Sequence, residues 1–233
     1  MNTEKKCSLG VCLLVGLLAI AVSLPIAVGK YAASSRSVTV KGLCEREVKA
    51  DRAIWPIVYK EGGNDLSALS KSVTRQNEII LEWLSQAGFS SEEVSVSAPK
   101  VEDTKTNSYD QRSYNYIMTS VITVCSSDVD KVRQMQSRQF DLLEKGIAIG
   151  AGSSWEYPIV YDYTALNDIK PEMIEQATLG AREAANKFAK DSGSRVGRII
   201  SASQGQFSIY DRDSNTPYIK TVRVVTTIQY SLK

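Results

Sequence analysis

The apolar and polar positions of the chain follow two alternating patterns. Residues 37–42 and 50–61 alternate as strands do, whereas from residue 65 to Gly88 apolar residues recur at three- and four-residue spacing, which predicts a helix. The same two patterns predict strands over 94–101, 114–125, 153–163, 195–207 and 218–232, and helices over 126–146 and 167–191. The predicted element order is therefore ββαββαβαββ.

The helix predicted after Asn167 or Asp168 carries mostly small residues on one side and stops at Ser192-Gly193. The stripe consists of Ile174, Ala177, Ala181, Ala184, Ala185 and Phe188. Small side chains allow a helix to lie close to a sheet, so we predict that this helix packs centrally in the fold.

The element order contains a nested unit. Residues 51–163 have the order βαββαβ of a ferredoxin-like split βαβ unit, and the first strand (37–50) could join the final αββ elements (164–233) in a second sheet. We therefore predict an α+β fold of two two-layer α/β subdomains. The ferredoxin-like subdomain is inserted in the other, and an N-terminal transmembrane or signal helix precedes both.

Residues 1–30 have the pattern of an export segment. Lys5 and Lys6 precede an uncharged run over residues 7–29, and a bilayer span takes about 20 residues. The segment is predicted to be either a cleaved signal peptide or a retained anchor in the inner membrane. Both alternatives place the rest of the chain in the periplasm or cell envelope.

The composition of the chain argues against several classes of function. The chain has 28 basic and 26 acidic residues, and the charges balance once Lys5, Lys6, Lys30 and Glu4 are set aside. Nucleic acid is not expected as a partner, because phosphate binding needs clustered cations. The chain has no histidine, which removes histidine-activated nucleophiles and histidine metal sites. We predict no catalytic residue, no metal and no cofactor.

Two cysteines follow the export segment. In an oxidising compartment Cys44 and Cys125 could form a disulfide or a peroxide-reactive thiol. The alternative is that both are small buried residues in strands of different sheets.

Aromatic side chains recur in the strand predicted over 153–163. Trp155, Tyr157, Tyr161 and Tyr163 would share one face of that strand with Ile159. This row could form an interface with another subunit or a ligand site, and cross-strand packing is the alternative.

Five segments in order resemble the SIMPL-domain family of exported bacterial proteins. They are VTVKG at 38–42 with the ADRA start at 50, residues 77–96, YIMTSVITV at 116–124, AREAANKFAKDSGSRVGRI at 181–199, and VRVVTTIQYSL at 222–232. Ala50 and Asn115 depart from residues that are frequent in the family. The resemblance implies an envelope protein with two α/β subdomains, ring-like assembly in some relatives and a link to oxidative-stress defence.

The function predicted from the sequence is a non-enzymatic, exported envelope protein that acts as a self-associating scaffold or binding protein. The alternatives are a thiol-based redox protein that uses Cys44 or Cys125, and a small-molecule binding module. The predicted partners are further copies of the chain, and the membrane through the N-terminal segment.

Overall fold

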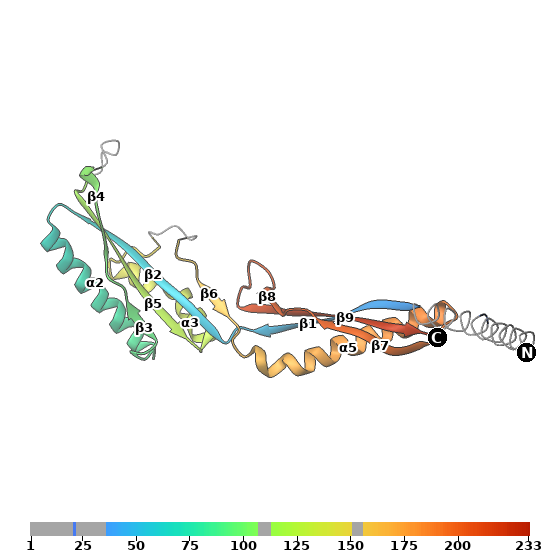
Figure 1. The fold of residues 1–233 in the computed structure, drawn as a ribbon. Coiled ribbons are helices and arrows are strands. Elements are labelled where there is room, and N and C mark those ends of the chain that lie inside the picture. Colours follow the sequence, from blue (N-terminus) through green and yellow to red (C-terminus); the bar gives the residue numbers. More distant parts are fainter. Residues whose placement is uncertain (1–20, 22–35, 107–112, 151–155) are drawn as a thin grey trace, which may run out of the picture. The chain divides into compact units, whose positions relative to one another are not determined.

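The structure, a computed structural model, describes residue 21 and residues 36–106, 113–150 and 156–233. Two antiparallel sheets and four α-helices occur among these residues (Figure 1), so the predicted α+β class is confirmed. The chain divides into two compact units. Unit 1 comprises the described part of Met1–Arg46 with Ile169–Ser208 and Arg223–Lys233, and unit 2 comprises Glu47–Asp168 and Ile209–Val222.

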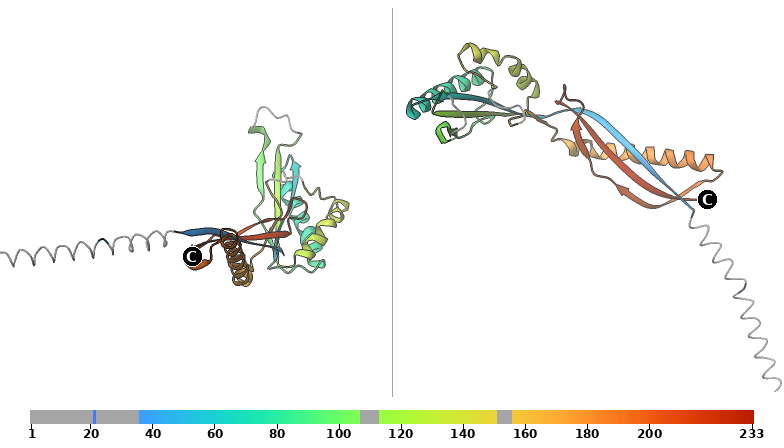
Figure 2. Two further views of the ribbon diagram at one scale, coloured as in Figure 1. Left: turned by 90° about the vertical axis from the view of Figure 1, so that its right-hand side faces the viewer. Right: turned by 90° about the horizontal axis from the view of Figure 1, so that it is seen from above.

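Unit 1 is built on a sheet of strand order β1-β9-β7, in which β8 also pairs with β9. Its elements are β1 (Ser37–Lys49), α5 (Leu166–Asp191), β7 (Val196–Gln204), β8 (Ser208–Asp211) and β9 (Ile219–Leu232), some of whose ends belong to unit 2. α5 runs along one face of the sheet (Figure 2). Since β9 lies between two strands, it is the central strand, and β7 is an edge.

α5 contacts the sheet through a row of residues spaced four apart. The row consists of Met173, Ala177, Ala181, Ala185 and Ala189, each at most 2% exposed. A Cβ on Gly42 of β1 would lie 1.8 Å from the carbonyl oxygen of Ala177, so only glycine permits this approach of strand and helix. The predicted close packing is confirmed, but its face is rotated: Ile174, Ala184 and Phe188 lie outside the row.

Unit 2 contains a sheet of order β3-β5-β2-β6, in which β4 also pairs with β5. Its elements are β2 (Arg52–Gly63), α2 (Leu66–Gln86), β3 (Val94–Val96), β4 (Lys100–Asp103), the 3-10 helix η1 (Thr104–Thr106), β5 (Tyr116–Ser126), α3 (Val129–Ser137), α4 (Phe140–Glu144) and β6 (Val160–Asp162). Each helical connection joins two strands that are separated by one other strand. This is the arrangement of a split βαβ unit.

The core of unit 2 lies between the sheet and its helices. Its fully buried residues include Ile57, Tyr59, Ile80, Leu84, Ile122, Val124, Val132 and Leu142. Asp65 caps α2 by accepting a hydrogen bond from the Ala68 amide at 3.0 Å, and Asp128 caps α3 in the same way. Leu66 of α2 and Leu143 of α4 fall within the apolar spacing of the predicted helices, yet each is 45% exposed.

Three predicted elements are divided or shortened. The strand predicted over 94–101 is two strands, β3 and β4, because Pro99 between them has no amide hydrogen to donate. The helix predicted over 126–146 is α3 followed by α4; Met135 and Leu142 are both buried, so the helical period continues across the break. Among the described residues of the strand predicted over 153–163, which begin at residue 156, only β6 is a strand, and it follows Pro158.

The predicted signal or anchor segment, residues 1–30, lies outside the described residues apart from residue 21. Within the described ranges, no helix has the length and apolar character needed to cross a bilayer.

Candidate functional site

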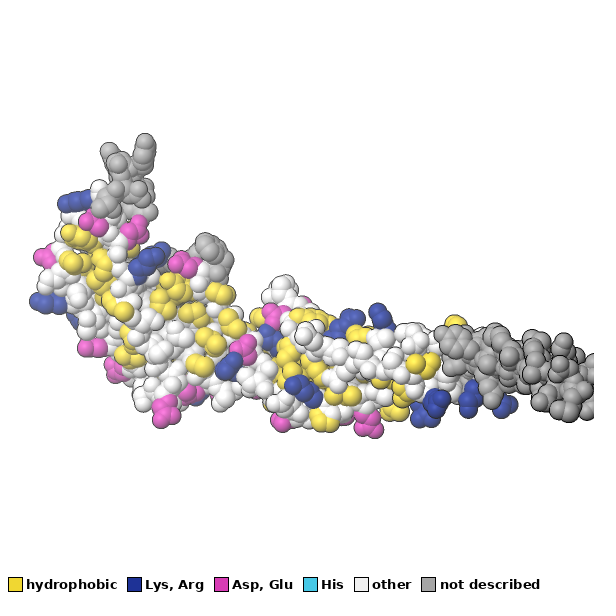
Figure 3. All heavy atoms as spheres, in the orientation of Figure 1, with side chains coloured by type: hydrophobic (Ala, Val, Ile, Leu, Met, Phe, Trp, Pro, Cys, Tyr) yellow, Lys and Arg dark blue, Asp and Glu magenta, His cyan; other side chains and the backbone are white. Residues whose placement is uncertain are grey.

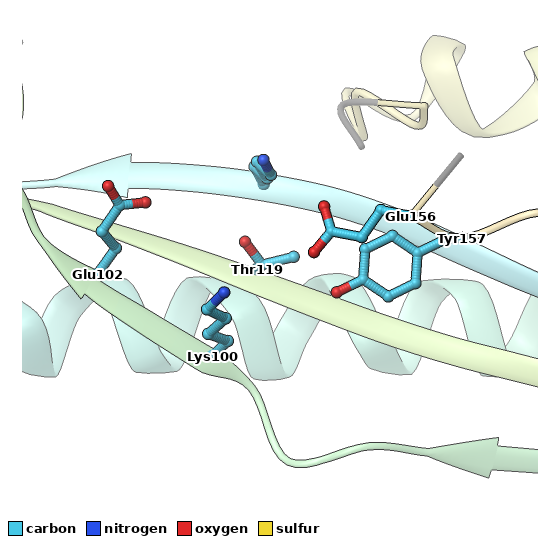
Figure 4. Close-up of a pocket in the computed structure, with 6 residues that line it drawn as sticks. Lys100, Glu102, Thr119, Glu156 and Tyr157 are labelled. Carbon is cyan, nitrogen blue, oxygen red and sulfur yellow. The ribbon is translucent and has the colours of Figure 1, made fainter. Parts of the chain in front are cut away.

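The face of the unit 2 sheet that points away from α2 carries a small polar pocket (Figure 4). Tyr59 and Ser120 both bond to Asn77 of α2, so their neighbours Lys60 and Thr119 point to the opposite face. The pocket is lined by Lys60, Lys100, Glu102, Thr119, Glu156 and Tyr157. Its volume of about 70 Å³ is well below the ~300 Å³ of small-molecule sites.

The structure separates the aromatic residues predicted to form one row. Tyr157 lies over the open face of the sheet, whereas Tyr161 is 6% exposed and belongs to the core of unit 2. Tyr163 follows β6 and is half-buried, and Trp155 lies outside the described residues. No continuous aromatic strand face is therefore formed by the described members of the row.

Tyr161 is held by polar and aromatic contacts inside unit 2. Its hydroxyl donates to Oε1 of Gln136 at 3.0 Å, and its ring meets Tyr218 edge-on at 6.2 Å between centroids. The guanidinium of Arg133 lies 3.5 Å from the centre of the Tyr218 ring. Burial raises the pKa of Tyr161. These contacts indicate a packing role for Tyr161.

Asp51, in the ADRA segment, organises the start of α5. Its carboxylate accepts hydrogen bonds from the amides of Thr164 and Ala165, both at 2.8 Å, and from the Thr164 hydroxyl at 2.9 Å. Partial burial raises the pKa of Asp51, but these hydrogen bonds together outweigh it and leave the pKa below its ordinary value. From the sequence, Asp51 was recognisable only as part of the ADRA segment that resembles the SIMPL-domain family.

The two cysteines are both free thiols in different environments. Cys44 lies in β1, is 6% exposed and donates to Oε1 of Gln176 at 3.1 Å. Burial raises the pKa of Cys44, which reduces its thiolate fraction. Cys125 lies in β5 of the other sheet and is exposed. The alternative that both cysteines are buried in different sheets therefore agrees with Cys44 but is wrong for Cys125, because Cys125 points to the uncovered face of the unit 2 sheet.

A groove separates α5 from the edge strand β7 in unit 1. It consists of two adjoining hollows of about 320 and 500 Å³ that share Asn186 and Val196. On α5, Thr178, Arg182, Asn186 and Lys190 recur every four residues along one wall, and Arg195 and Arg198 come from β7 and the residue before it. This cluster was not predicted from the sequence, because its members are divided between a helix and the strand that follows it and the total charge of the chain is balanced.

One edge of the sheet formed by β1, β9, β7 and β8 includes a long run of residues without charge. Residues 199–210, which include most of β7 and β8, contain no Lys, Arg, Asp, Glu or Pro. Ile199 and Ile200 are 53% and 51% exposed. Among the described residues, no strand pairs with the edge of β7 that faces away from β9. Natural proteins commonly protect such edges with charges, proline or a covering element.

The fold and its surfaces define a class of α+β proteins with two antiparallel sheets, an open sheet face and an edge strand that carries no charge from residue 199 onward. In the described part of the chain, no group of three or more Cys, Asp or Glu side chains could hold a metal ion.

The chain belongs to the SIMPL family. The family model, described as a protein of unknown function (DUF541), matches residues 38–230. The chain is also 25% identical over 177 residues to a Xenopus laevis protein named interleukin-1 receptor-associated kinase 1-binding protein 1 homolog. That match covers 75% of this chain and 65% of the relative.

Proposed function

We propose that this protein is a non-enzymatic binding protein that is exported and self-associates through the free edge of its unit 1 sheet. The uncharged edge of residues 199–210 carries the proposal, since exposed backbone donors and acceptors on an edge strand can pair with a second chain. The amphibian relative is named for binding a kinase, which supports a binding role.

The partner we propose for this edge is a second copy of the same edge. The opposite edge, β1, carries Lys41, Glu45, Glu47 and Lys49, and charges of this kind oppose edge pairing. Two identical β7 edges can pair antiparallel about a two-fold axis, which is the commonest symmetry of homo-oligomers. We also propose that residues 51–163 form a ferredoxin-like subdomain, and that it is inserted in the subdomain formed by residues 37–50 and 164–233.

Export is supported by the sequence of the N-terminal segment, in which Lys5 and Lys6 precede the uncharged run over residues 7–29. We further propose a role for the protein in oxidative-stress defence, as the family resemblance implies. It predicts that cells lacking the protein are more sensitive to peroxide.

The test of self-association is the mass of the full chain in neutral detergent, measured by light scattering across a dilution series. We expect at least a dimer for the native chain and a monomer for the double variant Ser201→Lys/Ser203→Lys, which places two charges on the β7 edge. The matched control Thr74→Lys/Ser85→Lys adds the same charge to exposed positions of α2 and should keep the native mass. A native monomer at every concentration, or an unaffected edge variant, would refute the proposed interface.

A further inference from the structure

Basic side chains gather at the end of unit 1 that contains the C-terminal part of α5 (Figure 3). We call this surface the basic end; its residues are Arg36, Arg182, Lys187, Lys190, Arg195, Arg198 and Lys233. Backbone hydrogen bonds bring three of them together from distant parts of the chain. The Leu232 amide donates to the Arg36 carbonyl oxygen at 2.9 Å, and Arg195 and Lys233 exchange two bonds of 2.9 Å.

The basic residues of the basic end outnumber the acidic residues beside them. Within residues 182–198, only Glu183 and Asp191 carry negative charge. None of the seven basic residues forms an ion pair with another described residue. By contrast, Arg46 of the same unit pairs with Glu172 at 2.7 Å. The basic end is therefore available to an anionic partner.

An exposed aromatic residue lies in the same part of α5 as two of these cations. Phe188 is 52% exposed, directly follows Lys187 and precedes Lys190 by two positions on α5. An exposed apolar ring flanked by lysines is typical of helices that rest on a membrane surface, where the ring enters the interface and the ammonium groups meet phosphates.

The position of the apolar segment identifies the partner. The uncharged run ends at Gly29, and Arg36 of the basic end follows seven residues later. Seven extended residues span at most about 25 Å. With residues 7–29 in a bilayer, Arg36 is held within that distance of the lipid headgroups, so weak contacts of the basic end benefit from a high effective concentration.

We infer that the basic end of unit 1 binds the anionic headgroups of the bilayer that receives the N-terminal segment. The inference rests on the export part of the proposed function, with the segment retained as an anchor. It adds a second membrane contact, made by α5, β7 and the ends of β1 and β9. Each basic residue near an anionic surface adds attraction, and the attraction weakens with salt.

Lysine footprinting of the full chain tests this inference. The chain is reconstituted with vesicles of phosphatidylcholine alone or with one third phosphatidylglycerol, and acetylation rates by a water-soluble ester are read by mass spectrometry. Acetylation of Lys187, Lys190 and Lys233 should slow by at least about fivefold on the anionic vesicles, the effect of a single basic residue at such a surface. The rate of Lys145 in unit 2 should not change. Protection should be lost in about 1 M salt, where the Debye length is about 3 Å.

Charge-removing variants locate the effect. Arg195→Gln/Arg198→Gln should lose the protection of Lys190 on anionic vesicles, whereas Lys71→Gln/Arg75→Gln, which removes the same charge from exposed positions of α2, should keep it. Equal rates on both vesicles, equal protection of Lys145, or tight binding of duplex DNA without lipid protection would each overturn the inference.

Association with phosphatidylcholine vesicles reports the N-terminal segment separately. Association with neutral vesicles but no anionic protection would refute the basic end as a lipid surface and leave the anchor intact. The opposite result is that the chain associates only with anionic vesicles, and that Arg195→Gln/Arg198→Gln removes the protection of Lys190 there. This result would support the basic end as a lipid surface and refute the retained anchor.

Discussion

Replacing Gly42 with alanine should destabilise unit 1, because the added Cβ would overlap the backbone of α5. The Cβ would lie 1.8 Å from the Ala177 carbonyl oxygen and 2.6 Å from the Ala181 amide nitrogen. Ordinary contacts begin near 3.4 Å, so α5 would have to move by about 1.5 Å at this point. The atoms in the way are backbone atoms and cannot rotate aside.

The expected cost is at the upper end of the range for overpacked cores, about 3 kcal/mol. A loss of this size should accelerate amide hydrogen exchange in the middle of α5 by about 100-fold, since 1.4 kcal/mol corresponds to a factor of ten. Exchange measured by mass spectrometry resolves α5 from unit 2, so the effect can be assigned to the contact.

Gly180→Ala in the same helix is the matched control. A Cβ there meets no heavy atom within 4 Å, and glycine inside a helix costs roughly 0.5–1 kcal/mol relative to alanine. This variant should therefore slow exchange in α5. If Gly42→Ala exchanged within threefold of the native protein, the close contact between β1 and α5 would be wrong.

Two further predictions follow from single side chains. Asp51→Asn should destabilise the protein by about 1.5–3 kcal/mol, since it weakens several hydrogen bonds to a carboxylate. Because the pKa of Asp51 is lowered in the folded protein, the carboxylate stabilises the fold fully above the unfolded pKa of about 3.9, and this stabilisation is lost as pH falls through the folded pKa. The free energy of unfolding of Asp51→Asn, measured in urea, should therefore fall less steeply at acid pH than that of the native protein. The same pH dependence in both proteins would contradict this role of Asp51. In the native chain, Cys125 should react with a charged thiol reagent at least about tenfold faster than Cys44, which is buried and has a raised pKa. Peptide mass spectrometry measures both rates, and rapid peroxide oxidation of Cys44 would instead favour the redox alternative.

The elements that the sequence predicted well are those with a long, uniform period. α2 was predicted from residue 65 to Gly88 and spans Leu66–Gln86, because its apolar residues repeat over several turns and Asp65 and Gly88 mark its ends. The β5 strand was predicted at 114–125 and spans Tyr116–Ser126. Short elements were harder to predict, since a three-residue strand such as β6 depends on its partner Arg52–Ile54 and not on its own pattern.

The surfaces were less predictable than the elements. The faces of β5 alternate in burial, so the covered face could be recognised only after α2 was placed. For this reason burial of Cys125 was one alternative from the sequence, since free cysteine is among the most buried residue types, and its exposure followed only from the fold. Similarly, the aromatic spacing around Tyr161 suggested one exposed row, but Pro158 interrupts the strand and Tyr161 turns into the core.

The balanced composition concealed the basic end because net charge ignores distance. Glu172 and Glu175 lie in the first half of α5, and Glu175 precedes Lys190 by 15 residues, or about 22 Å along a helix. Screening in physiological salt reduces interactions between exposed charges beyond about 8 Å. These carboxylates therefore offset little of the attraction between the basic end and a surface in contact with it. A chain whose charges sum to almost zero can thus present a cationic surface at the end nearest its apolar segment.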